Sequence, residues 1–190
     1  MSKESLQLPK TAFSMKASLP TKEPQILEKW EKNKVFERLR KISTGKKKFI
    51  LHDGPPYANG HIHMGTALNK ILKDMIIRFH QMSGKDSVYV PGWDCHGLPI
   101  EWKIEEQYKK KKKNKDDVPI KDFREECREF AKKWIQVHIK EFKRLGVVGD
   151  FKNYYSTMSN EAEAQIVREL GKFLLDGSLY QGYKPVLWST

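Results

Sequence analysis

The sequence predicts an α/β fold with a parallel sheet, and three observations support that prediction. A short apolar run, residues 49–51, is followed by a turn-rich loop and then by a strongly periodic helix. A second short apolar run, residues 87–90, comes after the helix and ends at Pro91-Gly92. Strand, helix and strand in this order form a βαβ unit, whose strands lie parallel and whose ligands bind beyond the carboxyl ends of the strands.

The residues before this unit are expected to form an extended arm and one helix. Residues 1–22 have no helical period and contain scattered apolar side chains, which suits a segment tethered across a surface. Residues 23–42 have a helical period, and Pro24 stands near the expected helix start. We therefore expect a first part, residues 1–45, and a second part, residues 46–190, that contains the sheet.

The segment between the first strand and the helix carries the strongest functional pattern. The strand itself, residues 49–51, is expected to be buried on both faces. The two prolines and two glycines that follow it before Ile62 cannot continue a strand or begin a helix. The backbone must therefore turn there and leave amide groups exposed.

The helix after this loop, residues 62–82, is predicted from apolar side chains at three- and four-residue steps. These side chains are expected to face the core, and they are Ile62, Leu68, Leu72, Met75, Ile76 and Phe79. The charged side chains are expected on the other faces, and they are Lys70, Lys73, Asp74 and Arg78. The first turn carries His63, Gly65 and Thr66, where unpaired amides and partial positive charge suit phosphate oxygens. A nucleotide is therefore the expected ligand.

The second half of the chain is expected to be mainly helical. Its expected elements are helices at 98–108, 119–145 and 161–175, a lysine-rich loop at 109–115 and a strand at 179–188. The lysine-rich loop is expected to be solvated surface, while contact with RNA stays open as an alternative. Ser159 is the expected cap of the last helix, whose core-facing side chains are expected to be Ile166, Leu170, Phe173 and Leu174.

Composition narrows the class of protein. The 190 residues are 38% apolar and 32% charged, which is typical of a soluble globular domain, and no apolar run is long enough to span a membrane. Without a signal or transit composition, a cytoplasmic location is expected. Cys95 and Cys127 are far apart, so reduced thiols are expected and a zinc site is not. The net charge of +12 favours a polyanion such as tRNA as partner.

Residues 63–66, His-Met-Gly-Thr, resemble the His-Ile-Gly-His motif of class I aminoacyl-tRNA synthetases and their nucleotidyltransferase relatives. The stretches that resemble the isoleucine-specific members of that family are residues 52–60, 68–74 and 90–101. Thr66 departs from the motif, because the family has a second histidine there. The resemblance implies that residues 46–190 are the N-terminal half of a Rossmann-like parallel-sheet catalytic domain of class I synthetases, truncated before the editing insertion.

The resemblance also implies an activity, which is ATP-dependent activation of isoleucine and its attachment to tRNA(Ile) in translation. ATP would arrive with Mg²⁺, the partners would be isoleucine, ATP and tRNA(Ile), and the complete enzyme would be a monomer. The family completes its site with a later Lys-Met-Ser-Lys-Ser loop, which these 190 residues lack. The chain alone is therefore expected to be inactive, and zinc is not expected on this segment.

Site residues follow from the same resemblance. The ATP-binding residues would be Asn59, His63, Gly65 and Thr66, of which His63 and Thr66 would be catalytic, and the amino-acid-binding residues would be Gly54, Pro55, Asp94 and His96. Gly65 would lie against the adenine. Asp94 and the carbonyl group of Gly54 would accept hydrogen bonds from the α-ammonium group, and Pro55 would touch the aliphatic side chain.

Most of these assignments have an alternative, which for Asn59 and His96 is a structural hydrogen bond. A histidine at a helix start can act only as a cap, a helix glycine can serve packing, and Asp94 can bond its own backbone in a turn. Thr66 can bond a phosphate or the helix backbone. For the whole chain, the alternatives are a segment of a valine, leucine or methionine synthetase, a free-standing nucleotidyltransferase, and a noncatalytic basic RNA-binding fragment.

Overall fold

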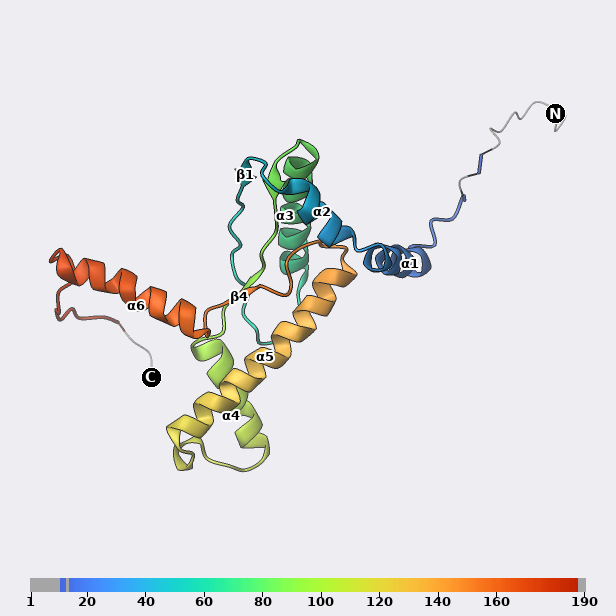
Figure 1. Cartoon of the computed structure of the whole chain (residues 1–190). Coiled ribbons are helices and arrows are strands. Elements are labelled where there is room, and N and C mark those ends of the chain that lie inside the picture. The colour runs from blue at the N-terminus through green and yellow to red at the C-terminus, as the bar shows by residue number, and fades with distance from the viewer. Residues whose placement is uncertain (1–10, 13, 188–190) are drawn as a thin grey trace. The chain divides into compact units, whose positions relative to one another are not determined.

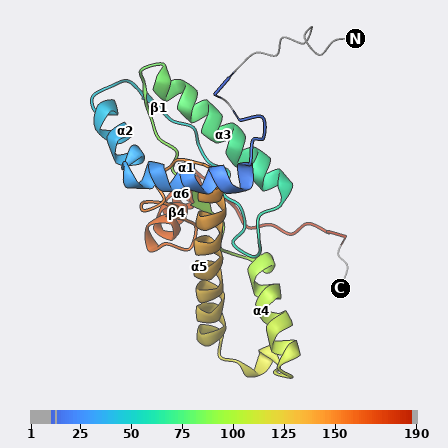
Figure 2. The same cartoon turned by 90° about the vertical axis from the view of Figure 1, so that its right-hand side faces the viewer.

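The computed structural model describes residues 11–12 and 14–187, and it divides the described chain into two compact units, one up to Ile42 and one from Ser43. The elements are α1 (Leu19–Lys32), α2 (Val35–Ser43), β1 (Lys48–Phe49), α3 (Met64–Met82), β2 (Asp86–Ser87), β3 (Gly92–Trp93), α4 (Leu98–Lys110), the 3₁₀ turn η2 (Lys115–Asp117), α5 (Ile120–Arg144), β4 (Tyr155–Ser156) and α6 (Asn160–Leu175). Figure 1 and Figure 2 show them in two views.

The first unit contains two helices where the sequence predicted one. α1 ends at Lys32 and α2 begins at Val35, because Lys34 adopts the left-handed conformation with φ of 49° and interrupts the helix. The predicted extended arm lies partly outside the described residues. Its described part up to Ser18 forms neither helix nor strand, but α1 begins at Leu19, so the arm is shorter than predicted.

The predicted βαβ unit is confirmed in the second unit. β1 and β2 pair in parallel, with Lys48 opposite Asp86 and Phe49 opposite Ser87, and α3 is the connection between them. The strands are shorter than predicted. The prediction that residues 49–51 are buried on both faces is wrong, because the side chain of Ile50 is 81% exposed.

A second parallel pair, β3 with β4, was not predicted. Gly92 lies opposite Tyr155 and Trp93 opposite Ser156. The pairing needs glycine at position 92, because a Cβ atom there would lie 2.0 Å from the ring of Tyr155. This pair brings the segment before Asp94 against a strand some sixty residues later in the chain.

The orientation predicted for α3 is wrong. Its buried side chains are Lys70, Asp74 and Ile77, while five predicted core residues are 42–62% exposed: Leu68, Leu72, Met75, Ile76 and Phe79. Burial of the charges is physically acceptable because they are paired. Asp74 bonds Arg78 and the amide of Val148, and Lys70 bonds the carboxylate of Asp53.

The predicted helices α4 and α5 are confirmed, and α4 lies against the N-terminal half of α5 (Figure 1, Figure 2). Ile104, Tyr108 and Phe123 form a small core between them. The lysine-rich loop is shorter than predicted, because α4 continues to Lys110 and η2 begins at Lys115.

The predicted last helix and its cap are confirmed. Ser159 Oγ accepts a hydrogen bond from the Ala162 amide at 3.2 Å, and α6 runs from Asn160 to Leu175. The core-facing prediction is wrong, because its side chains are 54–63% exposed: Ile166, Leu170, Phe173 and Leu174. The described residues after α6 include no strand up to Leu187, so the strand predicted there is also wrong.

The main core of the second unit lies between α5, α3 and the segments around β3. Its fully buried members include Ala58, Trp93, Ala131, Ile135 and Phe142. The indole of Trp93 stacks on the ring of Phe142, with ring centroids 6.1 Å apart. The core therefore holds α5 directly beneath the loops that carry the predicted site residues.

Candidate functional site

The two loops that carry the predicted site residues lie side by side. The amide of Asp94 donates to the carbonyl of Pro56 at 2.9 Å, and the amide of Ala58 donates to the carbonyl of Asp94 at 3.1 Å. Tyr57 and Asp94 form a parallel bridge through these bonds. The backbone therefore joins the loop after β1 to the end of β3, and the predicted amino-acid and nucleotide residues share one region.

A buried carboxylate, that of Asp53, ties this region to α3. Its oxygens accept hydrogen bonds from Lys70 Nζ at 2.7 Å, Lys73 Nζ at 2.5 Å, the hydroxyl of Tyr89 at 3.0 Å and the amide of Gly92 at 3.1 Å. Burial alone would raise the pKa of Asp53, but the bonds from the two lysines bring that pKa below its ordinary value. The carboxylate of Asp53 therefore links the start of the loop after β1 to α3, through Lys70, and to β3, through Gly92.

The N-terminus of α3 is capped by His63. Nδ1 of its ring accepts hydrogen bonds from the amides of Gly65 at 3.0 Å and Thr66 at 3.3 Å. An accepting Nδ1 carries no proton, so these bonds assign the neutral tautomer with the proton on Nε2. Nε2 makes no hydrogen bond within the described part of the chain. The ring thus caps the helix and keeps a free donor.

The residues around the cap include a glycine in close contact with the capping ring and two polar side chains without hydrogen-bond partners among the described residues. A Cβ atom at position 65 would lie 2.9 Å from Cε1 of His63, so glycine lets the capping ring approach the helix. The hydroxyl of Thr66 and the side-chain amide of Asn59 make no hydrogen bonds to other described residues. Both groups are half-buried.

The carboxylate of Asp94 is only weakly engaged. Oδ1 accepts long bonds of 3.4 Å from the amide of His96 and from the hydroxyl of Thr157. The bond to the amide two residues ahead is the turn interaction considered above as the structural alternative. Oδ2 has no partner among the described residues.

The other two predicted amino-acid-binding residues lie in the loop after β1. The Gly54 carbonyl lies 3.5 Å from Lys70 Nζ, and Pro55 is half-buried.

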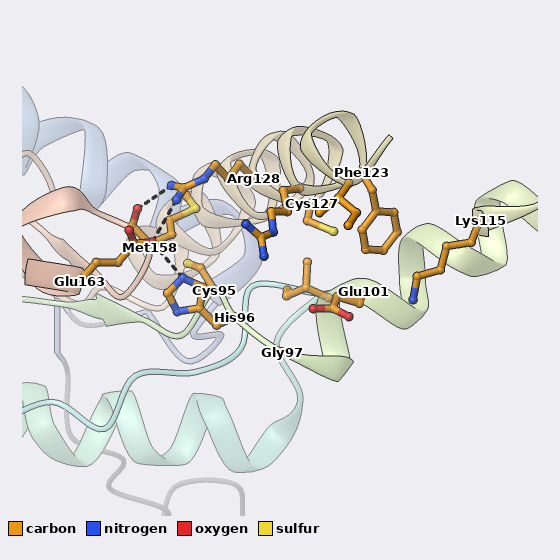
Figure 3. Close-up of a pocket in the computed structure, with 13 residues that line it drawn as sticks. Cys95, His96, Gly97, Glu101, Lys115, Phe123, Cys127, Arg128, Met158 and Glu163 are labelled. Atoms are coloured by element: carbon orange, nitrogen blue, oxygen red, sulfur yellow. Dashed lines mark hydrogen bonds and ion pairs between the residues drawn. The ribbon is translucent and has the colours of Figure 1, made fainter. Parts of the chain in front are cut away.

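The side chain of His96 lines a groove in another part of the second unit. A groove of about 550 Å³ lies between α4, α5 and the start of α6, and Figure 3 shows His96 on its wall. Nε2 of His96 lies 3.3 Å from Glu163, which also pairs with Arg128 at 2.9 Å. The structure therefore separates the imidazole of His96 from the cluster around His63.

The two thiols line the same groove (Figure 3). Burial raises the pKa of Cys95, and burial raises the pKa of Cys127 to about 11. Both are therefore neutral thiols near pH 7. Among the described residues no group of three or more His, Cys, Asp or Glu side chains is arranged to hold a metal ion. No helix of this described region is long and apolar enough to cross a membrane.

Sequence reasoning missed two residues of α5 that contact the loops. The indole nitrogen of Trp93 donates to Nδ1 of His138 at 3.1 Å, and Nε2 of His138 lies 2.5 Å from the carbonyl of Gly60. Glu141 bonds the next two residues of the loop. The available signal was a histidine and a glutamate three residues apart on the apolar face of α5.

A parallel βαβ unit with a helix N-terminus and two loops at its strand ends defines an α/β protein of the nucleotide-binding type. The LeuRS of Agrobacterium radiobacter K84, solved in a ternary complex with tRNA and LeuAMS, has the same fold: the TM-score is 0.62 at 20% identity, over 85% of this chain and 18% of that one. The family profile described as tRNA synthetases class I (I, L, M and V) matches residues 25–190. The chain belongs to that family.

Three relatives show how much of a family member the chain spans. It is 77% identical over 190 residues to an isoleucine--tRNA ligase of Pelagibacter ubique, covering all of this chain and 21% of that protein. Isoleucine--tRNA ligases of Mesorhizobium japonicum and Ruegeria pomeroyi are 61% and 62% identical over 187 residues, covering 98% of this chain and 19% of each protein. The chain therefore spans about a fifth of the length of these relatives.

Proposed function

We propose that this chain supplies the ATP half-site and part of the amino-acid pocket of an isoleucine--tRNA ligase. The observation that carries the proposal is the 77% identity along the whole chain to a protein of that name. The geometry supports it, because the backbone hydrogen bonds of Asp94 with Pro56 and Ala58 join the segment of Asp94 to the loop that leads into α3, whose start is capped by His63. ATP, isoleucine and tRNA(Ile) are the proposed partners.

In the proposed reaction the isoleucine carboxylate attacks the α-phosphate of ATP and pyrophosphate leaves. Such a displacement needs donors around the phosphates as negative charge moves to the leaving group. The free Nε2 proton of His63 is one proposed donor, and the hydroxyl of Thr66 is a second. Capping and catalysis are compatible in this proposal, since the two ring nitrogens of His63 perform different tasks.

The proposed amino-acid pocket uses the other side of the paired loops. The unbonded Oδ2 of Asp94 and the carbonyl of Gly54 would accept hydrogen bonds from the α-ammonium group. Pro55 would contact the aliphatic side chain. His96 would need a different rotamer to reach this pocket, because its ring bonds Glu163 in the groove. Asn59 would contact ATP through its unbonded amide.

The remaining parts of the proposal concern Mg²⁺, zinc, the oligomeric state and the location of the protein. Mg²⁺ would enter on the phosphates of ATP, with no carboxylate cluster of this segment required. The proposed enzyme is a cytoplasmic monomer, and we propose no zinc site on this segment. The net charge of +12 suits contact with tRNA phosphates.

The test is a chimera in which this chain replaces the matching segment of the Pelagibacter ubique relative. We expect isoleucine-dependent exchange of pyrophosphate into ATP. Activity with valine, leucine or methionine in preference to isoleucine would favour another member of the matched family. A folded chimera that binds tRNA without exchange would favour the noncatalytic reading. The 190 residues alone should show no exchange, because the remaining donors of the site are absent.

A further inference from the structure

One face of α5 contacts the loop that leads into α3. Trp134, His138 and Glu141 are spaced four and three residues apart, so they share that face. The ring of Trp134 meets the ring of His61 edge-on, with centroids 5.1 Å apart. We refer to Trp134, His138 and Glu141 as the loop-binding face of α5.

Glu141 makes the most specific contacts of this face. Oε2 accepts the backbone amide of Ile62 at 3.1 Å, and Oε1 lies 2.5 Å from Nδ1 of His61. The side chain of Glu141 is 24% exposed and its bond to the Ile62 amide is partly buried, whereas the ring of His61 is 74% exposed. A charged acceptor on a backbone amide is about twice as strong as a neutral one.

The loop depends on these bonds because little else fixes its backbone. Residues 59–63 belong to no helix or strand, so their amide and carbonyl groups must be satisfied in another way. A Cβ atom at Gly60 would have nothing within 4 Å, so no neighbouring atom packs against the side-chain side of the backbone there. His138 binds the carbonyl of Gly60 and Glu141 binds the amide of Ile62, so α5 fixes the loop at two points.

We infer that Glu141 and His138 are positioning residues that set where His63 stands at the start of α3. His63 directly follows Ile62 and is extended, with φ of −100° and ψ of 171°, so a shift of the Ile62 backbone carries the imidazole with it. The kinetic consequence of this inference rests on the proposed function. His138 also bonds Trp93, next to Asp94, whereas the side-chain hydrogen bonds of Glu141 within the described chain reach His61 and Ile62 alone.

Glu141 therefore gives the sharper test. In the chimera, Glu141→Ala should lower kcat of pyrophosphate exchange by about 10- to 100-fold, because a misplacement near 1 Å has that effect. The KM for isoleucine should change by less than about twofold, since the amino-acid side of the loops is held separately by Asp53 and by Asp94. Glu141→Gln keeps an acceptor for the Ile62 amide and should restore most of the rate.

Glu129→Ala is the matched control, because Glu129 lies on the same helix, is 61% exposed and, within the described residues, has its side chain paired with Lys132 alone. Equal kinetics of Glu141→Ala and Glu129→Ala would overturn the inference, as would a tenfold rise in the KM for isoleucine with kcat unchanged.

A second readout needs no activity. In the 190-residue chain, Glu141→Ala should speed hydrogen exchange of the Ile62 amide by about tenfold or more, because a lost acceptor opens that amide to water, while the amide of Ile77 in the middle of α3 stays protected. Unchanged protection of the Ile62 amide would overturn the inference. If the parental chimera shows no exchange activity, the proposed function fails, and this amide measurement still decides whether Glu141 holds the loop.

Discussion

Lys70 Nζ lies 2.7 Å from both carboxylate oxygens of Asp53, and each of the two side chains is only 1% exposed. Burying two charges costs several kcal/mol per ion, and the cost is offset only where further bonds satisfy the pair. Lys73, Tyr89 and the amide of Gly92 provide those bonds to Asp53. The pair therefore connects α3 to the start of the loop and to β3.

Removing one partner of this pair should be severe. Lys70→Met should lower the free energy of unfolding of the 190-residue chain by about 3 to 5 kcal/mol, because it leaves the carboxylate of Asp53 buried without its main partner. Lys133→Met, at an exposed position of α5, should change it by less than about 0.5 kcal/mol. Urea unfolding measures both. Similar losses in the two variants would contradict a structural role for the pair.

Low pH should remove the contribution of Asp53 to the stability of the folded chain. Burial acts to raise its pKa, but the hydrogen bonds from Lys70 and Lys73 outweigh it, and the folded pKa lies below the ordinary value of 3.8. As the pH falls, the carboxyl of Asp53 is therefore protonated in the unfolded chain before it is protonated in the folded chain. The stability that Asp53 contributes is complete above about pH 4 and is lost as the pH falls through the folded pKa. Asp53→Asn should show a shallower loss of unfolding free energy between about pH 5 and pH 2. Parallel curves would exclude this linkage.

His138 should contribute a second pH dependence at higher pH. Burial lowers its pKa below 6.5, although the Gly60 carbonyl and Glu141 act to raise it. The folded state favours the neutral ring of His138. The stability that this ring contributes to the fold is therefore complete above pH 6.5 and is lost as the pH falls through the folded pKa. His138→Gln keeps a donor and an acceptor but does not titrate. Its stability should therefore vary less between about pH 7 and pH 5 than that of the parent chain.

Two glycines should respond in opposite ways to alanine. At Gly149 a Cβ atom would lie 2.8 Å from the carbonyl oxygen of Tyr89, a backbone atom that cannot move aside cheaply. Gly149→Ala should therefore destabilise the chain by about 1 to 3 kcal/mol. At Gly171, inside α6, a Cβ atom meets nothing within 4 Å, so alanine should stabilise by up to about 1 kcal/mol. Thermal unfolding of both variants tests this, with a lower melting temperature expected for Gly149→Ala and a higher one for Gly171→Ala.

The two tasks proposed for His63 can be separated by substitution. His63→Ala should remove the cap, at a cost of about 1 kcal/mol in stability, and should lower kcat of pyrophosphate exchange in the chimera by about 10²- to 10³-fold. His63→Asn supplies another good capping side chain, so stability should recover while kcat stays low. Recovery of kcat together with stability would show that the ring matters only as a cap.

The sequence was sufficient to predict elements whose evidence is local. The βαβ order, the start of α5 after Pro119 and the Ser159 cap each depend on a few adjacent residues. The contact between Tyr57 and Asp94 agrees with the predicted parallel strands, because such strands end at one edge of a sheet.

The structural predictions that were wrong or missing depend on contacts between residues far apart in the sequence. Periodicity shows that α3 has an apolar stripe, but it cannot reveal that Asp53 draws Lys70 inward or that the stripe stays exposed. The pairing of β3 with β4 and the bonds from Glu141 to the loop span more than sixty residues, and no local signal in the sequence identifies the partner at the far end. The break at Lys34 was missed because lysine rarely adopts positive φ.

The most direct test of the proposed site is Asp94→Asn in the chimera, with pyrophosphate exchange measured over ranges of isoleucine and of ATP. The substitution keeps the size of the side chain and its bond to the His96 amide, but it removes the charge that would face the α-ammonium group. We expect the KM for isoleucine to rise by about tenfold or more while the KM for ATP changes by less than about threefold. Equal changes in the two KM values, or none, would contradict the assignment of Asp94 to the amino-acid pocket.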